Sequence, residues 1–344
     1  MNELSAIFAE ASASRTFPGG TILLARGETI VAHQSFGTTA YDNTISRAVT
    51  LDTIYDIASL SKLFTASAFL IAAREQGIPL ESPLARFFPE FASLEPISLL
   101  DLLRHTNGLQ MHVQELCAVG PEEWPRRIAD AGLVFSPGTS VRYTCTAYVL
   151  LGWIIEKLVG SSLEVWVQNR LIQPLGLKRT TYNAAQKLAP EEIAPTEIGE
   201  SGEPWRGVVH DEASRALGGI AGNAGIFSTA EDLGTFAQMW LNNGVFNGRE
   251  ILHRDDVTRA LTDAVQGEGF RQAIAWHLDV SSWMSAGAPR GTAGHLGFTG
   301  PSLFIVPETK HICIVLNNRV YPTRNGPARL RFHRRIAEWL FAHR

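Results

Sequence analysis

Apolar positions recur at helical spacing at both ends of this chain. In residues 2–12 one face carries apolar side chains only, a spacing typical of an amphipathic helix: Leu4, Ile7, Phe8 and Ala11. Residues 329–343 repeat the pattern, with Ile336, Trp339 and Leu340 on the inward face. We therefore expect a helix near each terminus, each with one side packed on the core.

Strand patterns lie just inside those two segments. Residues 21–25 and 29–32 are largely apolar and flank Arg26-Gly27-Glu28, which predicts a short β-hairpin. Near the C-terminus the strand-like segments are 273–280, 295–298, 302–306 and 311–316, the last two joined by Pro307-Glu308-Thr309-Lys310. The predicted strands thus come from the two ends of the chain.

Between them, from Ser59 to about Asn243, the pattern is mostly helical. Ser228-Thr229-Ala230-Glu231 forms a capping box, which predicts the start of a helix that Asn242-Asn243-Gly244 ends. The core face of that helix would carry Leu233, Phe236, Ala237 and Trp240. Residues 147–155 are apolar, but they are too few to span a membrane and are typical of a buried helix.

Strands and helices in this order do not alternate as they do in parallel βαβ folds. The simplest solution is an α/β (α+β) fold with one antiparallel sheet built from both termini, flanked by terminal helices, and a mainly helical lobe inserted. We treat residues 1–344 as a single domain. Its approximate lobes are a sheet lobe of residues 1–56 plus 250–344 and a mainly helical lobe of residues 57–249.

Composition narrows the class of protein. The 344 residues are 45% hydrophobic and 19% charged, as in ordinary globular proteins. A net charge of −4 offers no basic field for nucleic acid, and no apolar run reaches the ~18 residues of a membrane span. The first 20 residues show no export signal, so we expect a cytoplasmic location; a periplasmic or extracellular one follows if such a signal is missing from this chain.

Ser59-Leu60-Ser61-Lys62 is the strongest chemical signal. Residues at i and i+3 share one helix face, about 5–6 Å apart at Cβ, so Lys62 would place an amine beside the Ser59 hydroxyl. Burial lowers a lysine pKa, which makes Lys62 a candidate base. On local sequence alone, Ser59 could instead be a helix N-cap and Lys62 a solvated side chain.

Two further segments complete a pattern. Tyr143-Thr144-Cys145 precedes an apolar helix, and His295-Leu296-Gly297 lies in the strand-rich C-terminal third. Together with Ser59-x-x-Lys62, they make the chain resemble the class C β-lactamase superfamily of serine hydrolases. This superfamily includes class C β-lactamases, low-molecular-weight penicillin-binding proteins (DD-peptidases) and β-lactamase-like carboxylesterases.

The resemblance extends over nearly the whole chain. It includes Phe17-Pro18-Gly19-Gly20, Val209-His210-Asp211, and the segments 103–109, 217–228 and 318–322. It implies the β-lactamase/transpeptidase-like fold, with an active site between the sheet and the helical lobe. His105 is expected to be mostly structural, and the glycine-rich run 218–225 to be a close-packed wall of that site.

The resemblance also implies roles for single residues. Ser59 would be acylated, with Lys62 or Tyr143 as the base, a choice that the sequence leaves open. The main-chain N–H groups of Ser59 and Phe298 would stabilise the oxyanion. Gly297, lacking a side chain, would let substrate lie against the strand edge, while Cys145 and His295 would contact it. No cofactor is expected, and the scattered histidines form no metal-binding motif.

Two residues depart from the usual pattern. Cys145 stands where relatives commonly have Asn or Ser, and His295, which we expect to be partly charged near neutral pH, stands where they often have Lys. Both changes favour an esterase-like hydrolase on small acyl esters. The alternatives are a β-lactamase or D-alanyl-D-alanine carboxypeptidase, and a slow-deacylating penicillin-binding sensor. The ligand would be a small ester, a β-lactam or a short D-amino-acid peptide; the oligomeric state stays open.

Overall fold

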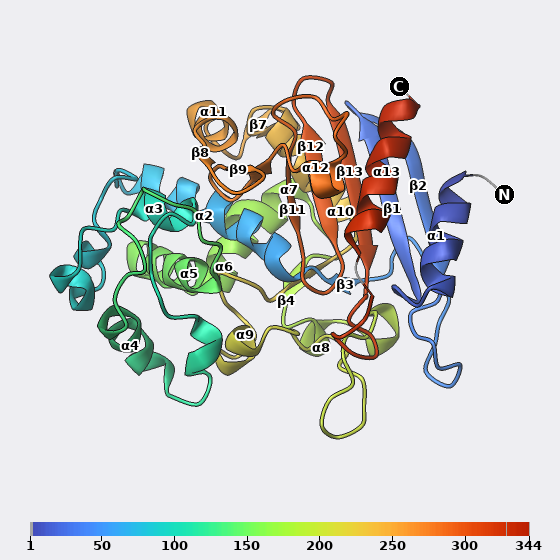
Figure 1. Ribbon diagram of the computed structural model, residues 1–344, viewed down its shortest axis with the longest axis horizontal. Helices are drawn as coiled ribbons and strands as arrows, with labels where there is room; N and C mark the ends of the chain where they lie inside the picture. The colour runs from blue at the N-terminus through green and yellow to red at the C-terminus, as the bar shows by residue number, and fades with distance from the viewer. Residues whose placement is uncertain (1–2, 328, 344) are drawn as a thin grey trace.

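A computed structural model describes residues 3–327 and 329–343. Its centre is an eight-stranded sheet in the order β2-β1-β13-β12-β11-β10-β9-β8, with every neighbouring pair antiparallel (Figure 1). The first strands, β1 (Gly19–Arg26) and β2 (Thr29–Gly37), lie beside β13 (His311–Asn317) from the other end of the chain. The predicted sheet built from both termini is therefore confirmed.

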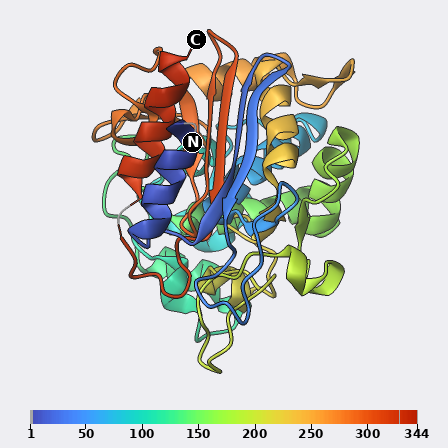
Figure 2. The same cartoon turned by 90° about the vertical axis from the view of Figure 1, so that its right-hand side faces the viewer.

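The terminal helices α1 (Glu3–Ala13) and α13 (Leu330–Ala342) lie side by side on one face of this sheet (Figure 2). Leu4, Ile7, Phe8 and Ala11 of α1 are all buried there, as their spacing predicts. Asn2, the first residue of the predicted helix, lies outside the described residues. Trp339 of α13 stays partly exposed, although the same reasoning placed it inward.

The opposite face of the sheet packs on the helical part of the chain through α10 (Ala230–Leu241). Phe236 of α10 stacks on Phe64 of α2 (Ser61–Glu75), with ring centres 4.1 Å apart. The strands β12 (Ser302–Val306) and β13 are buried along their whole length because helices cover both faces. Helix α2 is buried from Ser61 to Ala73, which fixes the residues at its beginning.

Three predictions about elements need correction. Residues 273–280 do not form one strand: β9 (Arg271–Gln272) and β10 (His277–Leu278) pair through a tight turn in which Ala275 has a φ of +63°. Helix α10 is capped by Thr229, whose side chain accepts from the Asp232 N–H, and not by Ser228. Helix α2 begins at Ser61, so Ser59 belongs to the preceding 3₁₀ turn η1 (Ala58–Leu60).

The remaining elements are short, apart from α5. The helices are α3 (Leu99–Leu103), α4 (Trp124–Asp130), α5 (Cys145–Val159), α6 (Leu163–Val167), α7 (Gln173–Leu175), α8 (Ala184–Lys187), α9 (Glu212–Ala216), α11 (Arg254–Thr262) and α12 (Ser281–Met284). The strands are β3 (Tyr55–Asp56), β4 (Thr181–Tyr182), β5 (Ile226–Ser228), β6 (Val245–Phe246), β7 (Arg249–Glu250), β8 (Val265–Gln266) and β11 (Ala293–Leu296).

Within the described part of the chain no single helix meets the length and hydropathy of a membrane span; only α5 and the following segment to Leu175, bent by 79°, meet them as a pair.

Candidate active site

A cavity of about 410 Å³ opens where the end of β11 meets the turn before α2 and the beginning of α5. Of the residues singled out in the sequence, Ser59, Tyr143, Cys145, His295 and Phe298 line it. Lys62 and Gly297 are buried just behind this wall. The other lining residues are Ala58, Gln114, His210, Asp211, Glu212, Ala224, His277, Leu296, Arg324 and Arg329.

The turn that carries Ser59 has an unusual backbone. Ala58 has a φ of +47°, in the left-handed region that side-chain-bearing residues rarely adopt. Asp56 holds it there, since the Ala58 N–H donates to the Asp56 carboxylate at 2.8 Å. The Ser59 side chain makes no N-cap bond to either η1 or α2. The N-cap interpretation of Ser59 is therefore wrong, and its hydroxyl faces the cavity.

Lys62 is fully buried, with no exposed surface. Its Nζ lies 3.0 Å from Ser59 Oγ and donates to the Asn223 carbonyl oxygen at 2.9 Å. The Sγ of Cys145 lies 3.7 Å away on the cavity side. The solvated alternative for Lys62 is therefore wrong: the amine lies among the residues that line the cavity.

Tyr143 completes the cluster from the loop before α5. Its ring centre lies 5.1 Å from Lys62 Nζ, and its hydroxyl is close enough to Lys62 and Ser59 for both to lower its pKa. Behind it lies the ring of His105, 4.5 Å away, whose Nδ1 accepts from the Thr144 N–H. His105 thus has a structural role, as expected: it closely follows the end of α3, with a φ of +57°, and it supports the Tyr143 segment.

The ionisation of Lys62 differs from the expectation. Burial, the largest single effect, lowers the Lys62 pKa, but Cys145, Tyr143 and Asp211 together raise the pKa above its ordinary value. Burial also raises the pKa of Tyr143, and the positive charge of Lys62 does not offset that increase. The resting site therefore holds an ammonium and a neutral phenol. The expected lowering of the Lys62 pKa is wrong because burial is not the only influence on it.

His295 is also less charged than expected. Its Nδ1 donates to the Leu296 carbonyl oxygen at 2.9 Å, so in the neutral ring Nε2 is an acceptor. Burial, with further contributions from His277 and Lys62, holds the His295 pKa well below its ordinary value. His295 is therefore neutral near pH 7, and not partly charged.

His277 was not identified from the sequence. Its ring stacks on His295 with centres 4.7 Å apart, and burial lowers its pKa to about 4. The pairing of His277 with Gly294 across β10 and β11 brings the two rings together. No motif marks His277, because its position beside His295 depends on the register between β10 and β11, which the local sequence pattern does not encode.

The two candidate oxyanion donors are the main-chain N–H groups of Ser59 and Phe298. Within residues 3–327 and 329–343, neither group donates to a main-chain carbonyl oxygen. Gly297 explains how they come close. A Cβ on Gly297 would lie 2.5 Å from the Ile57 carbonyl oxygen, so only glycine lets the end of β11 approach the turn that carries Ser59. The absent side chain therefore serves backbone packing, and that it also makes room for substrate stays a prediction.

Two arginines at the cavity rim were also missed. Arg329, just before α13, donates to the carbonyl oxygens of Gly297 and Phe298, and Arg319 donates to the same Phe298 oxygen at 3.0 Å. Burial and the neighbouring Arg319 lower the Arg329 pKa to about 9. Neither guanidinium pairs with a carboxylate among the residues that the structure describes. Arg324 differs, because it pairs with Glu197 and Glu212.

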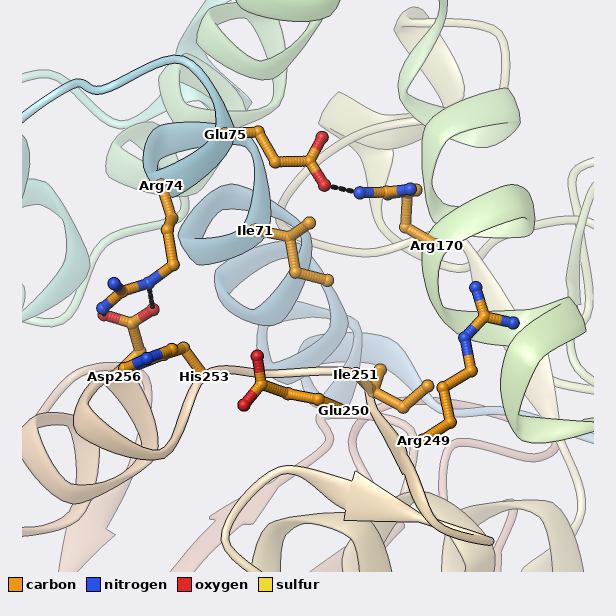
Figure 3. A pocket seen from close by; sticks show the side chains of 9 residues that line it. All are labelled: Ile71, Arg74, Glu75, Arg170, Arg249, Glu250, Ile251, His253 and Asp256. Carbon is orange, nitrogen blue, oxygen red and sulfur yellow. Dashed lines mark hydrogen bonds and ion pairs between the residues drawn. The ribbon is translucent and has the colours of Figure 1, made fainter.

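A second hollow, of about 240 Å³, lies at the other end of α2 (Figure 3). Its charged side chains pair with one another: Arg74 with Asp256 at 2.6 Å, and Arg170 with Glu75. It contains no candidate nucleophile, so we place the candidate active site at the Ser59 cavity. In the described ranges no group of three or more His, Cys, Asp or Glu side chains is arranged to hold a metal ion.

Comparisons with known proteins agree with this geometry. The sequence profile of the Beta-lactamase family matches residues 4–338. A putative D-alanyl-D-alanine carboxypeptidase of Escherichia coli strain K12 is 26% identical over 344 aligned residues, which cover 88% of this chain and 79% of that protein.

Solved structures share the fold. EstCE1, a hydrolase with promiscuous acyltransferase activity, superposes with a TM-score of 0.77 at 21% identity, covering 97% of each chain. A class C beta-lactamase mutant superposes with a TM-score of 0.78 at 18% identity, covering 99% of this chain and 96% of that one. At such identities the likeness establishes the β-lactamase/transpeptidase-like fold and leaves the reaction open.

Proposed function

This chain belongs to the Beta-lactamase family, and we propose that it is a serine hydrolase that forms an acyl-enzyme on Ser59 with small acyl esters. The observation that carries the proposal is the 3.0 Å contact between Lys62 Nζ and Ser59 Oγ on the wall of an open cavity. A hydroxyl in contact with a buried amine and a phenol is the arrangement that an activated serine requires.

In the resting cluster of Ser59, Lys62 and Tyr143, Lys62 is an ammonium and Tyr143 a neutral phenol. Neither group can then accept the Ser59 proton, so the cluster must first lose one proton before Ser59 Oγ can attack. Loss of that proton leaves a base, on Lys62 or on Tyr143, that accepts the Ser59 proton as Oγ attacks the acyl carbon. The Ser59 and Phe298 N–H groups stabilise the oxyanion. The proton then passes to the leaving group, and water hydrolyses the acyl-enzyme.

The choice of esters rests on the neutral wall opposite Ser59. His295 and His277 are both neutral near pH 7, so this wall lacks the fixed charge that a lysine would supply. Cys145 offers a weaker hydrogen bond to a substrate amide than an asparagine or a serine does.

A second candidate function is a β-lactamase or D-alanyl-D-alanine carboxypeptidase. Arg319 and Arg329 favour it, because guanidinium groups without carboxylate partners are suited to a substrate carboxylate. A slow-deacylating penicillin-binding sensor is a third, since Ser59 acylation alone does not ensure rapid hydrolysis.

A substrate panel separates the three candidates. The panel comprises p-nitrophenyl esters, nitrocefin and a D-Ala-D-Ala peptide, each followed for steady turnover and for the mass of a covalent adduct. Steady ester turnover without nitrocefin hydrolysis is the expected result. Turnover of nitrocefin or of the peptide would favour the second candidate, and an adduct without turnover the third. A protein that neither turns over nor is acylated by any of them would refute the proposal.

A further inference from the structure

Asp211, at the N-cap of α9, is a partly buried carboxylate that has no role in the chemistry above. Its Oδ1 accepts from the Ser214 N–H at 2.8 Å, from Ser214 Oγ at 3.0 Å and from Asn223 Nδ2 at 2.9 Å. Its Oδ2 accepts from Gln114 Nε2 at 3.1 Å. Four donors from three separate segments therefore hold this one carboxylate in place at the cavity wall.

Asn223 connects Asp211 to Lys62. Its side chain is fixed at both ends, because Nδ2 donates to Asp211 and Oδ1 accepts from Ser214 Oγ at 3.2 Å. Its main-chain carbonyl oxygen accepts from Lys62 Nζ at 2.9 Å. Fixing the Asn223 side chain therefore also fixes the acceptor that orients the Lys62 amine toward Ser59.

Asp211 is also the permanent negative charge near Lys62. The titratable groups that face Lys62 are Cys145, Tyr143, Asp211 and the three imidazoles of His105, His277 and His295. Burial keeps the pKa of Tyr143 above neutral and the pKa values of the three histidines below it, so Tyr143 and the three histidines are uncharged.

The carboxyl group of Asp211 keeps its charge. Burial is the largest single effect and raises its pKa, but hydrogen bonds from Ser214 and Asn223, with the charge of Lys62, outweigh burial and lower the pKa. Asp211 therefore stays ionised opposite the Lys62 ammonium.

We propose that Asp211 is a positioning residue for Lys62, which it orients through Asn223 and holds as an ammonium in the resting site. The role of Lys62 itself rests on the proposed function above. Asp211 thereby sets the pH at which the Ser59, Lys62 and Tyr143 cluster releases the proton that must leave before attack. A negative charge stabilises the more positive, protonated cluster, so removing the charge shifts that release to lower pH.

The Lys62 amine can be titrated directly, without any substrate. The chain has five lysines: Lys62, Lys157, Lys178, Lys187 and Lys310. The spectrum of ¹⁵N-lysine-labelled protein therefore contains few side-chain signals, and the signal that disappears in Lys62→Met belongs to Lys62. In Asp211→Asn, which keeps the shape of the side chain, the titration midpoint of Lys62 should fall by roughly 0.5–1 pH unit. The pH at which kcat/KM for a neutral ester rises on the alkaline side should fall by the same amount.

Asp232→Asn is the matched control. Asp232 is a buried carboxylate that accepts three hydrogen bonds, one fewer than Asp211, from the N–H groups of Lys178 and Arg179 and from Thr180 Oγ1, but it lies outside the cavity wall. Its replacement should leave the Lys62 midpoint unchanged. An unshifted midpoint in folded Asp211→Asn, or an equal shift in Asp232→Asn, would overturn the proposal. Because the NMR titration needs no turnover, a protein without esterase activity would refute the proposed function and still test Asp211.

Asn223→Ala isolates the orienting role and replaces Asp211→Asn should the latter fail to fold. It keeps the Asp211 charge but frees the loop whose carbonyl accepts from Lys62. We expect kcat for a neutral ester to fall by about tenfold while the Lys62 midpoint stays within ~0.3 pH unit, since misplacing a catalytic group is costly. An unchanged kcat in Asn223→Ala would contradict the orienting role.

Discussion

Lys62 Nζ lies 3.0 Å from Ser59 Oγ, although the two residues belong to different helical turns. Ser59 lies in the 3₁₀ turn η1 and Lys62 in the first turn of α2. A 3₁₀ turn superposes residues three apart along its axis, so the change from η1 to α2 keeps both side chains on one face. The contact therefore depends on the turn that Ala58 and Asp56 hold.

Ser59→Ala should abolish covalent labelling by a fluorophosphonate, because Ser59 is the only serine or threonine among the described residues that line the cavity. Intact-mass spectrometry measures the adduct. Ser67→Ala is the control, since Ser67 Oγ donates to the Leu63 carbonyl within α2 and lies outside the cavity wall. An adduct of unchanged mass on Ser59→Ala would mean that the nucleophile lies elsewhere.

Lys62→Ala and Tyr143→Phe should each lower ester turnover by about 10²–10⁴-fold, the usual effect of removing a general base. Initial rates on a p-nitrophenyl ester measure the loss. Lys157→Ala serves as the control, because Lys157 is exposed and its amine contacts the Phe87 carbonyl and the Phe88 ring, outside the cavity wall. Near-wild-type rates in either variant would remove that residue from the mechanism.

Iodoacetamide should inactivate the enzyme by alkylating Cys145. The thiol lies in the cavity wall, 3.7 Å from Lys62 Nζ, so an added carboxamidomethyl group would occupy the space beside Ser59. Residual ester activity after treatment is the measurement. Cys117→Ser and Cys313→Ser should be inactivated like wild type, whereas Cys145→Ser should keep the activity it had before treatment. Inactivation of Cys145→Ser at the wild-type rate would contradict this.

The preference for anionic over neutral esters should stay constant between pH 8 and pH 6. An unshifted imidazole with a pKa of about 6.5 would gain charge over that range, but burial holds the His295 pKa well below it. The ratio of kcat/KM for a matched ester pair measures the preference. In His295→Lys the ratio should be higher at every pH, because a fixed charge replaces a neutral ring. A ratio that rises toward pH 6 in the wild type would show that His295 becomes protonated.

Buried neutral histidines should make the fold sensitive to acid. The His277 pKa is about 4 in the folded protein and about 6.5 in the unfolded chain, so the unfolded state binds more protons in between. The stabilising contribution is complete above pH 6.5 and is lost as the pH falls toward 4. Thermal unfolding should show a smaller drop in Tm over that window for His277→Phe than for wild type. Equal drops would show that His277 does not contribute.

Periodicity predicted what depends on neighbours along the chain. The buried faces of α1 and α10, the β1–β2 hairpin and the contact between Ser59 and Lys62 all follow from spacings of a few residues. The assignment of two lobes at residues 57 and 249 stays a prediction, and so do the catalytic roles.

The features of the site that the sequence did not predict depend on contacts between segments far apart along the chain. The Lys62 ammonium reflects Cys145, Tyr143 and Asp211 around it, and the neutral His295 reflects its burial, with a smaller contribution from His277. Arg329 reaches the site only because the start of α13 packs against the end of β11. Burial and charge of this kind arise from the tertiary fold, which local spacing does not encode.

The pairing of β1 with β13 has a consequence for biosynthesis. Gly20 pairs with Asn317, so β1 cannot pair with β13 until the whole segment between them has been synthesised. β11, which supplies His295 and leads into Phe298, is joined to β1 only through β12 and β13. Closing such a non-local sheet is slow compared with forming helices. On the ribosome, therefore, Ser59 and Lys62 emerge long before the wall that faces them, and a nascent chain carries the candidate nucleophile without the second candidate oxyanion donor.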